Sequence, residues 1–253
     1  MVGTARQEPT VRLESQATDM LRYRDSGDGG LLVELGDRID WTLNTRTRRL
    51  AQLLERQALP GVVDIVPAYC SFLVIFESAT LDLDRLKAQI EELFQEIEDS
   101  GEEEPGASGR SVEIPVCYGG DFGPDLESMA QHNDLSPEEV IRIHSSGTYP
   151  VYMLGFAPGF PYLGGLDERI ATPRLDTPRS HVPAGSVGIA GSQTGIYPLA
   201  SPGGWRLIGR TPLTLFDPTA EDPVPYYRPG DSLRFIAISE EEFNRVLREG
   251  YHG

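Results

Sequence analysis

The segment GFAPGFPYLGG, residues 155–165, is the first in this sequence whose residue types suggest a binding site. Its aromatic residues Phe156, Phe160 and Tyr162 stand among glycines and prolines, which favour an irregular loop of fixed shape. Rings held in this way can wall a pocket for a flat small ring such as adenine. They can equally pin the loop to the rest of the fold, and the sequence leaves the two interpretations open.

A second group combines arginines with polar side chains in the same part of the chain. Planar guanidinium groups pair with carboxylates and phosphates through two parallel hydrogen bonds. The group is therefore a candidate anion site, provided that the fold brings its members together. These members are Arg174, Arg179, Arg206 and Arg210, with Gln193, Thr194, Tyr197 and Ser201.

His144 is the titratable residue with the clearest candidate role. It ends an expected helix, where the helix dipole favours a positive imidazole ring. Such a histidine acts either as a general base or hydrogen-bond donor, or only as a helix-terminal cap. The signatures GxSxG, GxxxxGK[ST], HExxH and strand-linked GxGxxG are absent, and we expect no metal site. The only lysine, Lys87, lies outside this region, which excludes a lysine Schiff base there.

The composition excludes several classes of partner. The chain has 253 residues with 22 basic and 39 acidic side chains, hence a formal net charge of −17. Its 39% hydrophobic and 8% aromatic content is that of a folded protein with one large or two modest domains. Such an acidic surface repels nucleic acid and anionic membranes, so we expect neither as a partner. The stretch 145–219 is different, with five arginines against four acidic residues.

The cysteines and the N-terminal residues bear on the cellular compartment. Cys70 and Cys117 stand far apart without a CxxC motif, so we expect two buried reduced thiols rather than a disulfide or a zinc site. The N-terminal residues lack the apolar core of a signal peptide, and no apolar run reaches about 18 residues. We therefore expect a cytoplasmic protein, with residues 1–18 as a flexible tail.

Hydrophobic periodicity predicts a small N-terminal α/β unit over residues 19–99. Its elements are a strand over 31–35, a helix over 41–57, strands over 62–66 and 72–76, and a helix over 81–98. The segment DSGEEEPGASGR then has no aliphatic residue and is rich in Gly, Ser and Glu, which is typical of a linker. We place this linker at residues 100–110 and a domain boundary with it.

The second domain, expected over residues 111–253, has a different composition. Between 145 and 219 the chain holds 12 of its 27 glycines and 10 of its 20 prolines, separated by short apolar runs. Short strands with frequent turns favour a closed or sandwiched β structure. The flanking elements are a strand over 112–118, helices over 124–132 and 136–143, a turn and strand over 227–239, and a helix over 240–248. Together the two domains predict an α+β fold.

Several of these segments together resemble one known family. They are VEIPVCYGGDFGPDL, HSSGTYPVYMLGFAPGFPYLGGL, VPAGSVGIAGSQTGIYPLASPGGWRLIGRTPLTLFDP and YRPGDSLRF, and the resemblance extends over about residues 18–239. The family is that of the 5-oxoprolinase B subunit, also called allophanate hydrolase subunit 1 or the KipI family. The resemblance implies a small N-terminal α/β unit followed by a C-terminal cyclophilin-like β-barrel, in agreement with the linker and the change of composition.

The resemblance also implies partners and a reaction. Family members pair with the C subunit of 5-oxoprolinase, of the KipA or allophanate hydrolase subunit 2 type, and together with the A subunit they hydrolyse 5-oxo-L-proline to L-glutamate while cleaving ATP. The implied activity is that of a hydrolase on a cyclic amide C–N bond. ATP is then a co-substrate accompanied by magnesium, no tightly bound cofactor is expected, and this chain is expected to be inactive alone.

Two alternatives remain open within the same resemblance. A related domain pair occurs within urea carboxylase as its carboxyltransferase portion, so an allophanate hydrolase or urea carboxylase type of subunit 1 is one alternative. Some members instead bind and inhibit a histidine kinase of sporulation, so a non-catalytic binding protein of the KipI type is the other. The sequence does not separate these classes.

The implied chemistry suggests roles for particular residues. A lactam is resonance-stabilised, and phosphorylation of its oxygen makes the ring carbon electrophilic, so ATP and a carboxylate substrate must be held close together. We expect an arginine to hold the anion and a histidine to move a proton. The expected catalytic residues are His144, Arg174, Gln193 and Tyr197. The expected substrate-binding residues are Phe156, Phe160, Tyr162 and Arg210.

Overall fold

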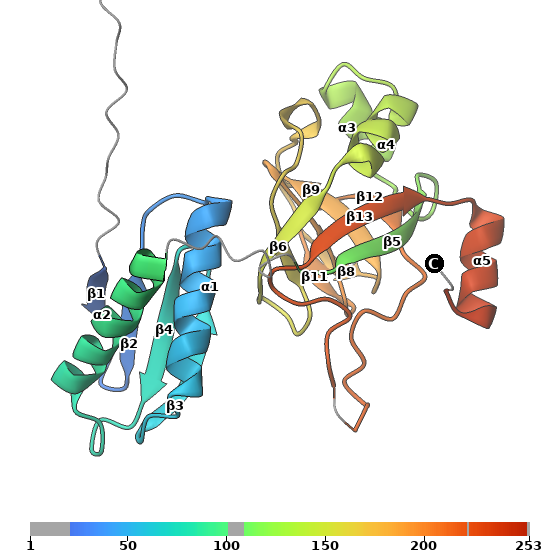
Figure 1. The fold of residues 1–253 in the computed structure, drawn as a ribbon. Helices are drawn as coiled ribbons and strands as arrows, with labels where there is room; N and C mark the ends of the chain where they lie inside the picture. The colour runs from blue at the N-terminus through green and yellow to red at the C-terminus, as the bar shows by residue number, and fades with distance from the viewer. Residues whose placement is uncertain (1–20, 101–108, 222, 252–253) are drawn as a thin grey trace, which may run out of the picture.

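Two units with separate hydrophobic cores make up the protein (Figure 1). The computed structural model describes residues 21–100, 109–221 and 223–251. The α+β fold class is confirmed, because a small sheet with two helices is followed by a larger barrel-like sheet with further helices. The expected tail and most of the expected linker lie outside the described residues, so the domain boundaries stay a prediction.

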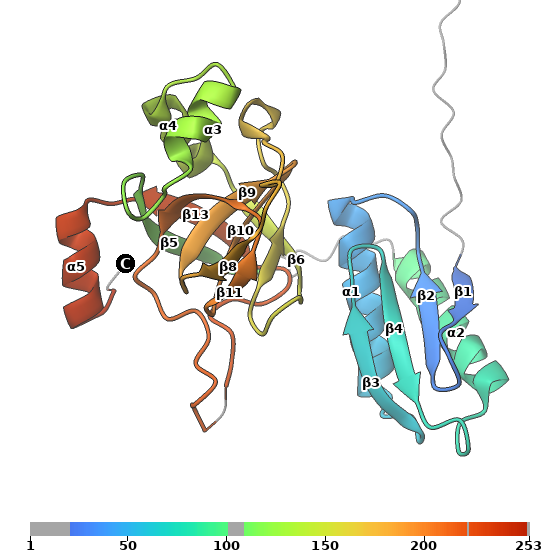
Figure 2. The ribbon, with the colours of Figure 1, turned by 180° about the vertical axis from the view of Figure 1, so that it is seen from behind.

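The N-terminal unit is an antiparallel four-stranded sheet with both of its helices on one face (Figures 1 and 2). Alternation along the strands turns Leu31 and Val33 towards the helices, where Leu50 and Ile90 meet them without solvent exposure. In the order of the sheet, the strands are β1 (Arg22–Asp25), β2 (Gly30–Glu34), β4 (Ser71–Phe76) and β3 (Val62–Pro67). The helices are α1 (Trp41–Arg56) and α2 (Leu83–Ser100).

The first strand of this unit is the element that periodicity missed. The prediction began with a strand over residues 31–35, whereas β1 pairs with β2 along its whole length. The sequence of β1 is RYRD, and only Tyr23 of the four is not exposed. An edge strand with three exposed polar side chains carries no apolar alternation from which it could be predicted.

The second unit is a seven-stranded sheet that nearly closes into a barrel, as the short strands and frequent turns predicted. Its two end strands, β7 (Pro161–Leu163) and β10 (Gln193–Ile196), lie against each other. In the order of the sheet, the strands are β10, β9 (Ser186–Ala190), β12 (Arg206–Arg210), β5 (Ser111–Tyr118), β13 (Ser232–Ala237), β6 (Tyr149–Leu154) and β7. A separate pair joins β8 (Arg179–Val182) to β11 (Ser201–Gly203).

Helices cover one end and one side of this barrel (Figure 1). The helices α3 (Leu126–His132) and α4 (Pro137–Ser146) lie together at one end, and α5 (Glu240–Glu249) lies outside the sheet. Helix α4 opens with a capping box, in which the Ser136 hydroxyl accepts from Glu139 N at 3.2 Å and the Glu139 carboxylate accepts from Ser136 N at 2.9 Å. The helix continues to Ser146, past the predicted end, so His144 lies inside it.

The cysteines differ from each other in burial. Both are free, but Cys117 is buried whereas Cys70 is only half-buried. The expectation of a buried thiol is therefore confirmed for Cys117 and wrong for Cys70. Burial raises the pKa of both thiols. In the part of the chain that the structure describes, no helix is long and apolar enough to cross a bilayer. Within those same residues, no three or more His, Cys, Asp or Glu side chains gather as a metal site would need.

Candidate functional site

Four of the expected site residues form one aromatic cluster on the barrel unit. Phe160 is buried at its centre, with ring centroids 5.5 Å from both Phe156 and Tyr162. The same ring meets Tyr197 at 5.6 Å and Trp205 at 5.5 Å, nearly edge to face. Phe160, Tyr197 and Trp205 belong to a small apolar core of their own, separate from the main core of the barrel. The loop 155–165 is thus pinned to the barrel, while Phe156 remains outside.

The aromatic cluster continues into the N-terminal unit through Tyr162. Tyr69, from the hairpin between β3 and β4, lies 5.9 Å from Tyr162 and 5.4 Å from Tyr152 by ring centroids. Gln193 Nε2 donates to the Tyr69 hydroxyl at 2.6 Å. Burial, together with the neighbouring Tyr162, raises the pKa of Tyr69 to about 12. Gln193 therefore links the two units through a neutral phenol.

Two polar residues of α1, Asn44 and Arg48, stabilise the N-terminal side of this junction. Asn44 Nδ2 donates to the carbonyls of Ala68 and Tyr69 at 3.1 and 2.9 Å, which fixes the hairpin that carries Tyr69. Arg48 Nε donates to Asn44 Oδ1 at 3.0 Å, and its guanidinium lies 5.4 Å from the Trp41 ring centroid. These residues were not predicted from the sequence. Polar side chains at positions of a helix where the spacing calls for apolar ones could have indicated them.

Removing the Tyr69 hydroxyl is expected to weaken the junction modestly. Tyr69→Phe leaves the ring contacts but removes the partner of Gln193, so we expect the free energy of unfolding to fall by about 1 kcal/mol. Chemical denaturation measures this change, and Tyr226→Phe, at a ring 39% exposed, is the matched control. Equal midpoints for the two variants would show that the Gln193 bond contributes nothing.

The four arginines of the candidate anion site differ in what their side chains contact. Arg179 is ion-paired, with Nη2 2.7 Å from Asp125 Oδ1, and its Nη1 donates to the Trp205 carbonyl at 3.4 Å. Arg174 is exposed and lies near Tyr197, since its charge, like that of Arg179, works against the burial that raises the pKa of the Tyr197 phenol. The edge of the cluster at Tyr197 therefore carries two positive charges, one of them exposed.

Arg206 and Arg210 are engaged with backbone carbonyls. Arg206 Nε donates to Pro173 O, and Arg210 Nε donates to Ala184 O, each at 3.0 Å. Among the described contacts, the Arg210 side chain reaches Ala184 and none of the clustered rings. The structure therefore brings Phe156, Phe160, Tyr162, Gln193, Tyr197 and Arg174 to one region, but gives Arg210 no contact with it.

His144 lies elsewhere, in the interior between α4 and the barrel sheet. The side chain is 0% exposed, and its ring stacks on Phe235 with centroids 4.4 Å apart. Its Nδ1 is 2.7 Å from the Tyr118 hydroxyl, and its Nε2 is 2.9 Å from Thr194 Oγ1. Because both ring nitrogens have partners and neither reaches solvent, His144 presents no free nitrogen to the region of the aromatic cluster.

The hydrogen bonds around His144 define its tautomer. Thr194 donates its own proton to the Gly188 carbonyl at 3.1 Å, so Thr194 Oγ1 must accept from His144 Nε2–H. Nδ1 is then the acceptor for the Tyr118 hydroxyl. Burial lowers the pKa of His144 to about 3, so the ring is neutral at pH 7. The Nδ1 lone pair already accepts from the Tyr118 hydroxyl. A role for His144 in proton transfer stays a prediction.

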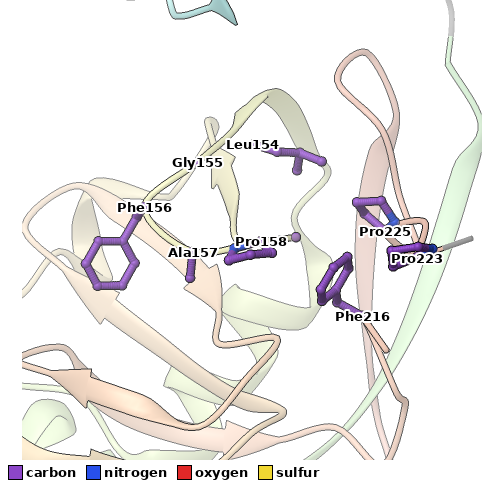
Figure 3. Close-up of a pocket in the computed structure, with 9 residues that line it drawn as sticks. Leu154, Gly155, Phe156, Ala157, Pro158, Phe216, Pro223 and Pro225 are labelled. Carbon is purple, nitrogen blue, oxygen red and sulfur yellow. The ribbon is translucent and has the colours of Figure 1, made fainter. Parts of the chain in front are cut away.

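A hollow between two loops lies beside the aromatic cluster (Figure 3). Its volume is about 480 Å³. One wall is the segment from Leu154 to Gly159, and the other is formed by Phe216, Pro223 and Pro225. Among the described residues, no charged side chain lines it, so it suits an apolar group better than an anion. Residues of the second wall were not singled out from the sequence, where they are typical loop residues.

Comparison with known proteins finds relatives that agree with one another on the family. Residues 21–226 match the family model described as carboxyltransferase domain, subdomain C and D. The chain is 46% identical over 233 residues to the 5-oxoprolinase B subunit of Bacillus subtilis, covering 88% of this chain and 95% of that protein. It is 24% identical over 258 residues to urea amidolyase of Saccharomyces cerevisiae, covering 91% of this chain and 14% of that protein.

A solved structure agrees with the sequence relatives. The crystal structure of TTHA0988 has a TM-score of 0.72 and 38% sequence identity to this chain. The match covers 87% of this chain but only 40% of TTHA0988, so that protein continues well beyond the shared part. The resemblance noted in the sequence is confirmed, and the chain belongs to the family of the 5-oxoprolinase B subunit, built as subdomains C and D of a carboxyltransferase domain.

Proposed function

We propose that this chain is the B subunit of an ATP-dependent 5-oxoprolinase complex, which hydrolyses 5-oxo-L-proline to L-glutamate. The observation that carries the proposal is the 46% identity to the 5-oxoprolinase B subunit of Bacillus subtilis over 95% of that protein. A relative matched along nearly its whole length is similar over the complete chain rather than over one part of it. The chain is accordingly one subunit of a larger enzyme.

The proposed reaction needs two anions side by side. Transfer of the γ-phosphoryl group of ATP to the lactam oxygen releases ADP and makes the ring carbon electrophilic. Water then adds at that carbon and the C–N bond breaks, which leaves an acyl phosphate of glutamate. A second water hydrolyses this acyl phosphate, so that glutamate and inorganic phosphate are formed. Arg174 is exposed, and its charge works against the burial that raises the pKa of the Tyr197 phenol, which supports a role for its guanidinium in holding a carboxylate or phosphate. We propose ATP with magnesium as co-substrate, and the C and A subunits as partners that complete the site.

Reconstitution tests the proposal directly. Glutamate release from 5-oxoproline and ATP is measured with this chain alone, with the C subunit, and with the C and A subunits from the same genome. We expect glutamate only from the three-subunit mixture. Glutamate from the chain alone would overturn its role as a dependent subunit, and no glutamate from any mixture would overturn the proposed reaction.

A second substrate class is favoured by one observation, the similarity to urea amidolyase over 91% of this chain. The same mixtures are therefore assayed with urea and with allophanate, and ammonium release is measured. If ammonium appears and glutamate does not, the complex acts on a urea-derived substrate. Binding to partners without turnover of any of the three substrates would instead favour a binding protein of the KipI type.

A further inference from the structure

The two units meet through three ring contacts and one side-chain hydrogen bond between described residues. Tyr69 of the N-terminal unit contacts the rings of Tyr152 and Tyr162 in the barrel unit. Its hydroxyl also accepts from Gln193 Nε2 at 2.6 Å. The Trp41 ring meets Tyr152 edge to face, with centroids 5.5 Å apart. None of these four rings belongs to the main core of either unit, so each unit keeps its core when the junction separates.

One buried charge opposes this junction. Arg48 is 8% exposed, and its Nη1 lies against the barrel unit, where a Cβ atom on Gly230 would stand only 2.6 Å away. Its acceptors are Asn44 Oδ1 at 3.0 Å and Thr45 Oγ1 at 3.4 Å, and among the described residues no carboxylate pairs with it. Burial accordingly lowers the pKa of Arg48. Desolvation of a cation without a counter-ion costs free energy, and separation of the units returns the guanidinium to water.

The solved relatives differ in how well they match this chain as a whole. The crystal structure of PH0987 from Pyrococcus horikoshii is 46% identical in sequence, and the match covers 88% of this chain and 100% of PH0987. Its TM-score is nevertheless 0.51, against 0.72 for TTHA0988 at 38% identity. The barrel unit makes up more than half of this chain, so a score of 0.51 is comparable to that from superposition of one unit alone. The relative placement of the two units therefore differs between PH0987 and this structure.

Separation at the junction uncovers residues that the sequence analysis placed in the site. Strand β7 carries Tyr162 and strand β10 carries Gln193, and Tyr69 contacts both side chains in this structure. Figures 1 and 2 show α1 and β6 as elements along which the two units face each other. A ligand that takes the amide hydrogen now bonded to Tyr69 must displace that hydroxyl, so it binds only after the units have moved apart.

We propose that the two units exchange between the closed arrangement of this structure and an open one, and that Tyr69 is the residue that holds them closed. In the open arrangement Tyr69 has left Gln193 and Tyr162, which are then accessible from solvent. The ring contacts and the Gln193 bond favour the closed arrangement, whereas the buried charge of Arg48 favours the open one. Because these contributions oppose each other, the two arrangements differ little in free energy, and a ligand shifts their populations. The junction thus controls access to this part of the candidate site.

Distances between the two units measure the two populations directly. Nitroxide labels are attached through genetically encoded p-acetylphenylalanine in place of Glu96 on α2 and Glu127 on α3, which are both exposed. This chemistry leaves Cys70 and Cys117 unlabelled. Pulsed electron–electron double resonance on the full chain then gives the distribution of distances. Circular dichroism verifies that each variant is folded.

Substitutions at Tyr69 and Arg48 test the opposing contributions. Tyr69→Ala removes two ring contacts and the hydrogen bond, so we expect the ratio of open to closed to rise by about 30-fold or more. Tyr69→Phe removes only the hydrogen bond, and the expected rise is about fivefold. Arg48→Met removes the buried charge and keeps an unbranched apolar chain beside Trp41, so we expect the ratio to fall by about fivefold. Tyr226→Ala, at a tyrosine 39% exposed on the barrel unit, is the matched control and is expected to stay within about twofold of the parent chain.

The same single distance in the parent chain and in Tyr69→Ala would overturn the proposal, since the units would then be held in one arrangement. A rise in Tyr226→Ala as large as that in Tyr69→Ala would overturn it too, because the effect would not belong to the junction. A rise in Arg48→Met would contradict the effect assigned to the buried charge. The measurement needs no substrate and no partner subunit, so its outcome is independent of the proposed reaction, which the glutamate assay tests separately.

Discussion

Replacing His144 by alanine is expected to lower the free energy of unfolding by about 3–5 kcal/mol at pH 7. The substitution leaves a cavity beside Phe235, whose ring lies 4.4 Å from that of His144 by centroids. It also removes the hydrogen-bond partners of the Tyr118 hydroxyl and of Thr194. Urea denaturation followed by circular dichroism measures the change.

The pH dependence of stability gives a sharper test of the same residue. The folded pKa of His144 is about 3, against an ordinary value of 6.5. Between these values the unfolded chain binds the proton and the folded chain does not, so stability falls as pH decreases, by about 1.4 kcal/mol per pH unit below the ordinary pKa. His144→Phe is expected to remove this contribution, whereas His132→Gln, at an exposed histidine, keeps it. Equal slopes in the two variants would contradict the buried neutral ring.

Activity of the folded variants separates the two roles of His144. A structural role predicts that turnover in the reconstituted complex follows the folded fraction of His144→Gln. A role in proton transfer predicts loss of turnover even where this variant is fully folded, together with a changed pH profile. Full turnover of a folded His144 variant would remove the catalytic assignment.

Replacing Asp125 by alanine is expected to lower the free energy of unfolding by about 2–4 kcal/mol. Asp125 is 7% exposed, and its carboxylate accepts from Arg179 Nη2 and from Leu207 N, each at 2.7 Å. The substitution therefore leaves the Arg179 guanidinium without its counter-ion and the buried Leu207 amide without this acceptor. Since the Arg179 side chain is 30% exposed, solvent screens part of this loss.

Two further variants calibrate the Asp125 prediction. Asp125→Asn keeps an acceptor for Leu207 N but loses the charge, so we expect about half of the destabilisation. Asp217→Ala, at an exposed carboxylate that accepts from the neighbouring Thr219, is expected to change stability by about 0.5 kcal/mol or less. Identical denaturation midpoints for Asp125→Ala and Asp217→Ala would contradict the structural role of the buried pair.

Features that depend on neighbouring residues could be predicted from the sequence. The helices over 41–57 and 81–98 follow from apolar spacing, and the capping box at Ser136 follows from residue types three positions apart. Phe156, Phe160 and Tyr162 lie close together because few residues separate them. Local periodicity, capping and turn chemistry act over a few residues, so they can be predicted from a single sequence.

Features that depend on distant segments were decided only by the tertiary structure. Asp125 pairs with Arg179 and Tyr69 with Gln193 across long stretches of chain, and Pro223 meets the loop of Phe156. Sequence spacing likewise left open which way His144 faces. The sequence by itself determined the helices, the family and the loop that carries Phe156, but not the edge strand β1. Closure of the barrel decided that His144 is buried and Phe156 exposed, because burial is set by which surfaces meet in space.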